Sequence, residues 1–396
     1  MKILYVAMSD SVHVARWISQ VTDQGWEIFL FPAYRTKPIN EFKNITIFGT
    51  DPSRPANLDK SVRVARWSSI YFYLDALTKL VKNKSSNKFK EMALAHAIQS
   101  IKPDIVQSLE FQHAGYLTLN AKKKLGNKFP TWIATSWGSD IYLFGRLPEH
   151  QEPIRQILEF CDYFSCECDR DAQPARDMGF RGQVLPVLPS RGGAHIEDMM
   201  NFRQPGPVSD RKTILVKGYQ GWAGRALVAF QAFRKCLDIL QGYTIVVYVA
   251  GEDVKIASHL FSQETGIPVE VISPASVSDQ EILSQFGQAR IYIGLSISDG
   301  ISTSLLEAMV MGAFPIQSCT ACADEWIRDG YSGIIVPPED PDEIANAIRR
   351  ALMEDTLVDR AAEINTTIVK KRLDYFTVKQ QAVKMYREIY ESRKDL

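Results

Sequence analysis

Acidic and hydroxyl side chains cluster directly after an apolar run that ends at Ser296. Asp299-Gly300 is followed by Ser302-Thr303-Ser304 and then by a helical pattern, in which Glu307 lies one turn from the start. Backbone N–H groups at the start of a helix, helped by the helix dipole, bind phosphate well. A carboxylate one turn further along can accept hydrogen bonds from vicinal hydroxyls of a sugar or ribose. The spacing therefore favours a phosphate site with a hydroxyl-binding carboxylate beside it.

The same residues have a purely structural alternative. Ser304 and Glu307 have the spacing of a capping box, in which each side chain bonds the other residue's backbone N–H at a helix start. Such a box needs no ligand and is a common way to begin a helix. The sequence leaves both roles open, and the two can coexist.

Many positions around this segment match, in one order, the donor-site signature of a known family. The stretch resembles retaining glycosyltransferases of the GT-B fold, the large glycosyl transferases group 1 family that includes many bacterial sugar transferases. The resemblance is clearest over residues 211–355. The matched positions are Asp299, Glu307-Ala308-Met309, Gly312, Pro315, Glu325, Asp329-Gly330, Gly333 and Pro337-Pro338.

This resemblance implies a nucleotide-sugar donor, with a UDP-sugar favoured, bound mainly by the C-terminal half. In the family the second acid of the pair contacts the nucleotide ribose, and here that acid is Glu307. The first acid lies near the donor sugar hydroxyls; here it is Asp299, one methylene shorter than the commoner Glu. The loop that would face the distal phosphate contains Gly300, Ser302, Thr303 and Ser304.

The family also stabilises the leaving diphosphate with two cations, for which Lys217 and Arg225 are the matching residues. A departing nucleotide diphosphate gathers negative charge, and fixed cations in a dry cleft stabilise it. Solvated surface cations are the alternative reading. Asp169-Arg170-Asp171 has the Asp-x-Asp spelling of a metal site, but it lies in the N-terminal half and favours a helix start. We therefore expect no catalytic metal and no cofactor apart from the donor substrate.

Two loops of the N-terminal half match positions at which the family binds ligands. One has Trp137 where the family has a histidine, followed by Gly138 and then by Asp140. Trp137 suits stacking on a sugar face or packing, and Asp140 suits a site role or a helix cap. The other loop follows the first strand and offers weaker candidates. Asp10 there also suits a helix cap, and His13 suits a structural role.

Short β-branched runs alternate with helical patterns along nearly the whole chain, which predicts parallel sheets covered by helices on both faces. We expect an α/β protein of the GT-B fold, with two doubly wound Rossmann-like domains, an interdomain cleft and a C-terminal crossover helix. The acceptor-binding domain would be residues 1–204 completed by helix 375–396, and the donor-binding domain residues 205–374. A linker is expected at 201–212.

Charge and composition exclude several classes of protein. With 45% hydrophobic and 23% charged residues, the 396-residue chain is neither disordered nor a small disulfide scaffold. The chain has 46 Lys+Arg and 46 Asp+Glu residues, which argues against a uniformly basic protein that coats nucleic acid. Residues 1–130 nevertheless carry 19 basic and 10 acidic residues. Aromatics such as Trp67 are interleaved with the basic residues, so the segment suits an anionic membrane surface or a lipid-linked acceptor. A solvated face whose aromatics point inward is the alternative.

The same N-terminal part favours a helix over 61–100, interrupted near 83–87. No run approaches the ~18 apolar residues of a membrane span, and no signal peptide is expected. Six cysteines in such a chain are expected to be reduced. We expect a cytoplasmic protein that can also bind peripherally to the inner face of the plasma membrane.

The function implied by the resemblance is a retaining, metal-independent transfer of a hexosyl or N-acetylhexosaminyl group to an acceptor hydroxyl. The acceptor would be a lipid-linked oligosaccharide or another bacterial surface glycan, of the lipopolysaccharide O-antigen or capsule type. One alternative is a non-catalytic nucleotide-sugar-binding subunit. Another is a GT-B enzyme of other chemistry, such as a phosphorylase or an epimerase. Nucleic acid is not expected as a partner.

Overall fold

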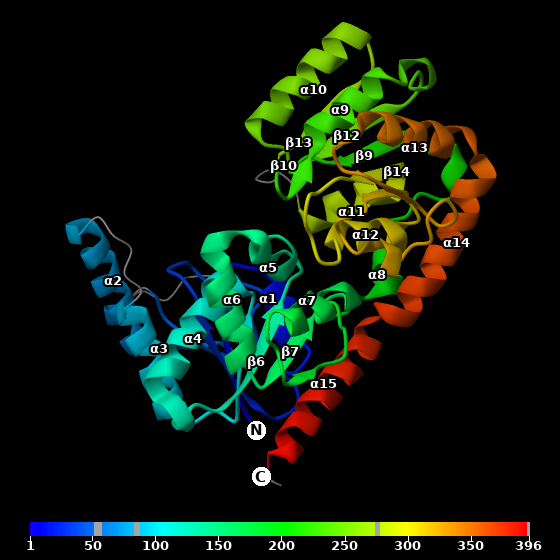
Figure 1. Cartoon of the computed structure of the whole chain (residues 1–396). Helices are drawn as coiled ribbons and strands as arrows, with labels where there is room; N and C mark the ends of the chain where they lie inside the picture. Colours follow the sequence, from blue (N-terminus) through cyan, green and yellow to red (C-terminus); the bar gives the residue numbers. More distant parts are fainter. Residues whose placement is uncertain (51–57, 83–87, 274–277, 394–396) are drawn as a thin grey trace. The chain divides into compact units, whose positions relative to one another are not determined.

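The computed structural model describes residues 1–50, 58–82, 88–273 and 278–393 (Figure 1). The chain divides into two compact units: unit 1 is Met1–Gly193 with Phe376–Leu396, and unit 2 is Ala194–Tyr375. The division after Gly193 precedes the expected boundary at 204. The reason is that Ala194 and Ile196 already pack into the core of unit 2.

Unit 1 is built on a parallel sheet that has eight strands within the described residues, in the order β4-β3-β2-β1-β5-β6-β7-β8. Ile3 and Tyr5 of the central strand β1 pack into the core on one face. Leu4 and Val6 pack on the other face, so the strand is apolar without interruption. The strands are β1 Lys2–Ala7, β2 Glu27–Pro32, β3 Thr46–Phe48, β4 Arg63–Ala65, β5 Ile105–Leu109, β6 Thr131–Ser136, β7 Tyr163–Cys166 and β8 Gln183–Val184.

Helices cover both faces of this sheet. Figure 1 shows α2, α3 and α4 lying side by side over one face, which α6 extends, whereas α1 and α15 pack on the other face. The helices are α1 Val12–Ser19, α2 Ser69–Lys82, α3 Lys88–Ile101, α4 Tyr116–Leu125, α5 Ser139–Tyr142, α6 Pro148–Phe160, α7 Ala172–Asp177 and α15 Tyr375–Ser392.

The helix expected to begin at 61 begins later. Residues 63–65 form the edge strand β4, which pairs with β3, and α2 starts at Ser69. The burial of Arg63–Ala65 does not alternate, so it is the pairing with β3, and not a local pattern, that makes this segment a strand. The predicted interruption near 83–87 lies outside the described residues.

Unit 2 contains a second parallel sheet, with the order β13-β12-β9-β14-β15-β16, and a small antiparallel hairpin. The sheet strands are β9 Thr213–Lys217, β12 Thr244–Tyr248, β13 Val269–Ile272, β14 Ala289–Gly294, β15 Phe314–Ser318 and β16 Ile334–Val336. The hairpin strands are β10 Gln220–Gly221 and β11 Gly224–Arg225. Numbered from β9, the order is 3-2-1-4-5-6, the doubly wound arrangement that the sequence predicted.

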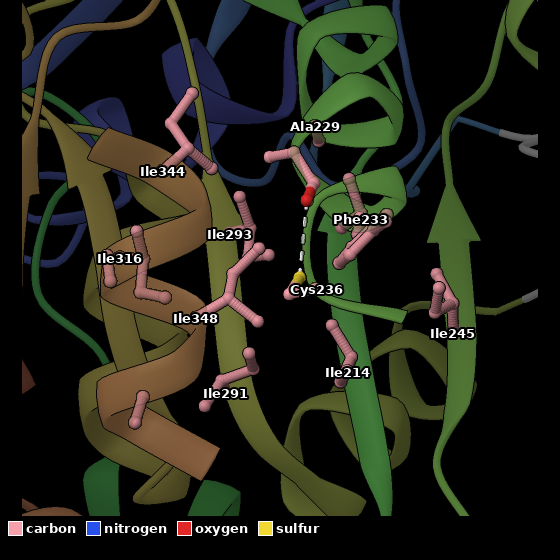
Figure 2. Close-up of a cluster of buried hydrophobic side chains, with 14 of the residues drawn as sticks. Ile214, Ala229, Phe233, Cys236, Ile245, Ile291, Ile293, Ile316, Ile344 and Ile348 are labelled. Carbon is pink, nitrogen blue, oxygen red and sulfur yellow. Dashed lines mark hydrogen bonds between the residues drawn. The ribbon is translucent and has the colours of Figure 1, made fainter. Parts of the chain in front are cut away.

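The two faces of this sheet are covered by separate sets of helices. Helices α9, α10 and α13 share one core with it, and α8, α11 and α12 share the other, while α14 contributes to both. In Figure 2, isoleucines of four adjacent strands pack against α9 and α13, and the Cys236 thiol donates to the carbonyl of Ala232 at 3.2 Å. The helices are α8 Ile196–Met200, α9 Ala226–Arg234, α10 Glu252–Thr265, α11 Asp279–Gln288, α12 Thr303–Met311, α13 Pro341–Met353 and α14 Asp355–Arg372.

The segment expected to be a linker lies within unit 2 and is anchored there by two buried side chains. Val208 is buried, and the buried Arg211 donates to the carbonyls of Ala289 and Met311, each at 3.1 Å. Pro205, Gly206 and Pro207 are exposed, so they form a surface turn of unit 2 that Val208 and Arg211 anchor, and not a connection between the units.

Helix α15 completes unit 1 from the far end of the sequence. It begins at Tyr375, the last residue of unit 2, and its remaining residues belong to unit 1. Its Tyr386 is fully buried, where its hydroxyl accepts hydrogen bonds from Tyr5 Oη at 2.9 Å and Trp17 Nε1 at 3.0 Å and donates to Gln107 Oε1. Four elements, β1, α1, β5 and α15, are thus joined through one hydroxyl. Among the helices of the described ranges, none is long and apolar enough to span a bilayer.

Candidate functional site

In the sheet of unit 2, the strands after β9 are added on one side of it and those from β14 on the other side. β9 and β14 are therefore neighbours, although β12 and β13 lie between them in sequence. Ligands of doubly wound sheets bind at the carboxyl ends of strands at such a switch point. Lys217 ends β9, and Asp299 lies in the loop after β14. The Lys217 Nζ is 3.7 Å from Asp299 Oδ2. The fold therefore brings two predicted site residues together at the place where a ligand is expected.

The environment keeps Lys217 charged. Its side chain is only 13% exposed, and burial, the largest single effect, lowers its pKa. Asp299, helped by Tyr292, Tyr219 and Glu307, more than offsets burial, so the pKa lies above the ordinary value. Tyr219 adds to this environment, since the ammonium lies 5.1 Å from the centre of its ring. A lysine that stays charged at a site largely shielded from water can stabilise a phosphate.

The start of α12 settles the capping alternative. The residue that precedes the helix is Ser302, and α12 begins at Thr303, so Ser304 already lies in the first turn. The capping-box reading of Ser304 and Glu307 was therefore wrong. The Ser302 side chain does not cap the helix either. Its hydroxyl is buried and has no hydrogen-bond partner within the described parts of the chain.

This arrangement suits an anion at the first turn of α12. The N–H groups there are not occupied by the side chain of the residue at the N-cap, and a buried hydroxyl lies beside them. Gly300 is buried, while Asp299 and Glu307 are half-buried. The loop and the first turns of α12 thus hold a hydroxyl and two partly accessible carboxylates around one helix start.

Two tyrosines of the neighbouring strands were not predicted from the sequence. Burial raises the pKa of Tyr248, at the end of β12, well above 10, and Tyr292 and Glu307 raise it further. Burial also raises the pKa of Tyr292 in β14, although the Lys217 ammonium lowers it in part. Both phenols therefore stay neutral beneath the site. Their signal in the sequence was a polar hydroxyl inside otherwise aliphatic strands.

Arg225 lies in a different local setting from Lys217. Its Nε is 3.0 Å from Glu339 Oε1, and its Nη1 donates to the carbonyls of Gly221 and Gly224, the latter at 3.1 Å. The guanidinium therefore braces the β10–β11 hairpin. Its backbone N–H donates to the Leu295 carbonyl at 3.0 Å, which ties the hairpin to the loop after β14. A role for Arg225 at a phosphate stays a prediction.

A second polar cluster lies at the switch point of unit 1, where β1 and β5 are neighbours. Asp10 does not cap the first helix, because the N-cap of α1 is Ser11; Asp10 Oδ1 instead accepts from Tyr34 Oη at 3.1 Å. The Tyr34 ring meets the imidazole of His113 edge-on, with 5.4 Å between ring centres. His13 lies half-buried in the first turn of α1.

Glu110 and His113 belong to this cluster, and sequence analysis missed both. Glu110 directly follows β5 and has a positive φ of 76°, which non-glycine residues rarely adopt. Its carboxylate accepts from the N–H groups of His113, at 2.8 Å, and Ala114, at 2.5 Å, and so caps the π-helical turn Phe111–Gly115. The same carboxylate lies 3.4 Å from His113 Nδ1 and raises the pKa of that imidazole.

Asp140 joins the loops after β5 and β6. Its carboxylate accepts from the N–H groups of Phe111, at 2.9 Å, and Trp137, at 2.5 Å. It lies inside α5, whose N-cap is Gly138, so the helix-cap alternative is wrong. Burial, and then the charge of Glu110, raise the pKa of Asp140 to about 7.

Trp137 and Gly138 form the turn between β6 and α5. Gly138 has a φ of 82°, and its N–H donates to Ser136 Oγ at 3.2 Å. Trp137 is half-buried and packs against the core cluster of unit 1. Its Nε1 is buried and has no hydrogen-bond partner within the described parts of the chain. The contacts favour the packing alternative for its ring. The Asp169–Asp171 segment is a short 3₁₀ turn that leads into α7, as the sequence predicted.

Comparison with known proteins supports the sequence resemblance. Residues 200–367 match the family of glycosyl transferases group 1, and residues 2–164 match the glycosyl transferase 4-like family. An uncharacterised glycosyltransferase of Methanocaldococcus jannaschii is 32% identical over 159 residues, which are 39% of this chain and 38% of that protein. A GDP-mannose:cellobiosyl-diphosphopolyprenol alpha-mannosyltransferase of Komagataeibacter xylinus is 26% identical over 197 residues, 48% of each chain. Each alignment thus spans less than half of the relative's length.

Solved structures agree with the fold. The Anabaena protein Alr3699/HepE in complex with UDP has a TM-score of 0.66, with 15% identity. The superposition covers 98% of this chain and 100% of that one. The two sheets, their parallel strands and their covering helices are therefore those of a GT-B fold.

Proposed function

We propose that this chain, whose residues 200–367 match the glycosyl transferases group 1 family, is a retaining glycosyltransferase that uses a nucleotide-diphosphate sugar. The observation that carries the proposal is the arrangement in unit 2. There the charged Lys217 and the loop carboxylate of Asp299 lie at the switch point with the buried Ser302 hydroxyl at the start of α12. With Glu307, one turn into α12, these residues match the three chemical parts of such a donor: diphosphate, sugar hydroxyls and ribose.

The site residues of unit 2 divide the donor between them in this proposal. Lys217 stabilises the charge that develops on the leaving diphosphate, and the amides of the first turn of α12 bind the distal phosphate. Asp299 accepts from hydroxyls of the donor sugar, and Glu307 accepts from the ribose. The acceptor hydroxyl attacks the anomeric carbon of the donor sugar from the same face from which the diphosphate leaves. An oxygen of the leaving phosphate takes the proton of that hydroxyl. No protein nucleophile and no metal are needed.

The donor and acceptor are proposed by class. We favour a UDP-sugar, which accords with the UDP in the complex of the Anabaena protein, whereas the name of the Komagataeibacter relative indicates GDP-mannose as its donor. That name also indicates a diphosphopolyprenol-linked acceptor. We propose a lipid-linked glycan acceptor on unit 1, beside Asp10, His113 and Asp140, where polar groups gather at the switch point.

A thermal-shift panel of nucleoside diphosphates and nucleotide sugars tests the donor class, since a ligand stabilises the folded state in proportion to its saturation. One base is expected to raise the unfolding temperature more than the others, and EDTA is expected to leave transfer activity intact. Absence of any stabilisation would contradict the proposal. Release of sugar phosphate from nucleotide sugar and inorganic phosphate would favour a phosphorylase. Binding without turnover, with a competent acceptor present, would favour a non-catalytic subunit.

An exposed apolar stripe supports contact of unit 1 with a membrane. Ile70, Tyr73 and Leu77 follow helical spacing on α2 and are 60%, 57% and 39% exposed, and Trp67 just before the helix is 38% exposed. Contiguous exposed apolar patches mark sites of contact with proteins or membranes. The alternative of aromatics that point inward holds for Phe72, which is 2% exposed, but not for Trp67 and Tyr73.

Charge indicates which surface would cover this stripe. Arg63 and Arg66 next to it are exposed, whereas the acidic Asp75 of α2 is buried, where it accepts from the N–H groups of Phe89 and Lys90 at 3.1 and 3.3 Å. An apolar stripe with basic flanks suits the anionic inner face of a plasma membrane. We therefore propose that the protein is peripheral to that membrane.

Vesicle sedimentation tests this surface. Wild type is expected to sediment with phosphatidylglycerol-containing vesicles and much less with phosphatidylcholine vesicles. Replacement of Ile70 and Tyr73 by Ser is expected to abolish the difference. The matched control replaces Ile256 and Leu260, an exposed pair on α10, by Ser. Equal sedimentation of both double variants would contradict the membrane surface without touching the transferase proposal.

A further inference from the structure

Two large aromatic side chains lie exposed on the connection between β9 and α9. Tyr219 is 42% exposed and Trp222 is 48% exposed. Trp222 is at the two-residue turn of the β10–β11 hairpin, and Tyr219 comes directly before β10. Both therefore follow the carboxyl end of the strand that carries Lys217.

The hairpin is fixed to the ligand edge of the sheet by its backbone. The N–H of Ile297 donates to the Trp222 carbonyl at 3.0 Å, and the N–H of Ala226 donates to the Tyr219 carbonyl at 3.1 Å. Gly224 makes this closure possible, because a Cβ at that position would lie 2.3 Å from the Tyr219 carbonyl oxygen. The two aromatic residues are therefore held on a braced turn and not on a loose loop.

The position of the hairpin indicates which part of a donor it would meet. The Lys217 ammonium lies 5.1 Å from the centre of the Tyr219 ring and 3.7 Å from the Asp299 carboxylate, so both groups flank one cation. The Trp222 carbonyl bonds the N–H of Ile297, two residues before Asp299. The hairpin thus belongs to the Asp299 side of the site, where the donor sugar is proposed.

We propose that Tyr219 and Trp222 form an aromatic platform that packs against the donor sugar, and this inference rests on the proposed function. The substrate class is a hexopyranosyl nucleotide, whose ring has an apolar face of C–H groups and a rim of hydroxyls. Aromatic rings bury such a face with little loss of conformational freedom, while Asp299 and Lys217 bind the polar rim and the diphosphate. The platform selects for a pyranose and leaves the base to other contacts.

Calorimetric titration of two ligands separates the sugar contact from the nucleotide contacts. The ligands are the nucleoside diphosphate of the preferred base and the corresponding hexose nucleotide. Trp222→Ala is expected to weaken binding of the hexose nucleotide about three- to tenfold while the affinity for the diphosphate changes less than about twofold. Tyr219→Leu is expected to act in the same direction. Trp222→Phe and Tyr219→Phe keep a ring and are expected to bind nearly as wild type.

Controls guard against a merely structural effect. Phe376→Ala removes another exposed aromatic side chain, 63% exposed, from unit 1 and is expected to change neither affinity. The thermal unfolding midpoint of each variant reports folding directly. Equal weakening of both ligands by Trp222→Ala, or no weakening of either, would overturn the platform. If wild type binds neither ligand, the proposed function fails instead, so the two failures are distinct.

Discussion

Lys217 Nζ and Asp299 Oδ2 lie 3.7 Å apart at the ends of two strands that are adjacent in the sheet and distant in the sequence. The pair has a direct chemical use. Asp299 is the main group that favours the charged ammonium in the free protein, and an incoming diphosphate supplies further negative charge to the same cation. The cation is thus in place before the leaving group develops its charge.

Loss of this cation is expected to affect turnover more than folding. Lys217→Met removes the charge and keeps an unbranched side chain, and kcat/KM is expected to fall by about 100-fold or more. Steady-state transfer assays with the preferred donor measure this. The matched control is Lys212→Met, whose exposed lysine directly precedes β9 and so lies at the opposite end of the strand from Lys217. Wild-type kcat/KM in Lys217→Met would contradict the role.

Glu307 is expected to recognise ribose hydroxyls. Glu307→Ala should weaken nucleoside diphosphate binding by about ten- to a hundredfold, because a hydrogen bond to a charged acceptor is lost. It should also remove the preference of wild type for the ribonucleotide over the 2′,3′-dideoxynucleotide. Calorimetry on both ligands measures the two effects, with Glu264→Ala, an exposed partner of Arg234, as control. A preserved preference in Glu307→Ala would assign the ribose to another residue.

Asp140 is expected to make stability depend on pH. Its pKa is raised to about 7 in the folded chain, against ~3.9 in an unfolded one, so the folded state binds more protons between these values. Stability should therefore fall as the pH rises from about 4 to 7. Asp140→Asn should show a smaller fall in unfolding temperature over this range than wild type, and the exposed Asp177→Asn should match wild type. Identical slopes in all three proteins would refute the assignment.

Tyr386 is expected to anchor α15 to unit 1. Tyr386→Phe leaves the buried Tyr5 hydroxyl, Trp17 indole N–H and Gln107 side-chain carbonyl short of a partner, at a cost of about 1–3 kcal/mol. The thermal unfolding midpoint should fall accordingly. The exposed Tyr73→Phe should leave it unchanged. A midpoint equal to that of wild type would mean that the hydroxyl network contributes nothing net.

The fold was largely predictable because its signal is local. Apolar runs such as residues 2–7 and 289–294 are buried on both faces, and the alternation of such runs with helical patterns indicates parallel sheets. The edge strand at 63–65 was missed because it is short and half-exposed, and tertiary pairing with β3 decided it. The boundary after Gly193 was missed because packing, and not composition, places residues 201–212 in unit 2.

The site was predictable in its members and less so in its contacts. Lys217 and Asp299 could be named because each follows a strand, yet only the strand order makes them neighbours. Ser302 and Ser304 are equally good caps by type, so the sequence could not decide where α12 begins. The role of Glu110 could not be predicted, because its carboxylate binds N–H groups of the following turn that only the folded backbone, with its positive φ at Glu110, brings within reach.

The completion of unit 1 by α15 has a consequence for biosynthesis. Unit 2 is one continuous stretch, Ala194–Tyr375, and can fold as soon as it has left the ribosome. The first 193 residues leave earlier but lack the helix that covers Trp17 and Tyr5. Nascent unit 1, whose sheet face is then covered by α1 without α15, must therefore wait until the whole of unit 2 has been translated. That interval is when the protein is most exposed to aggregation and to chaperones.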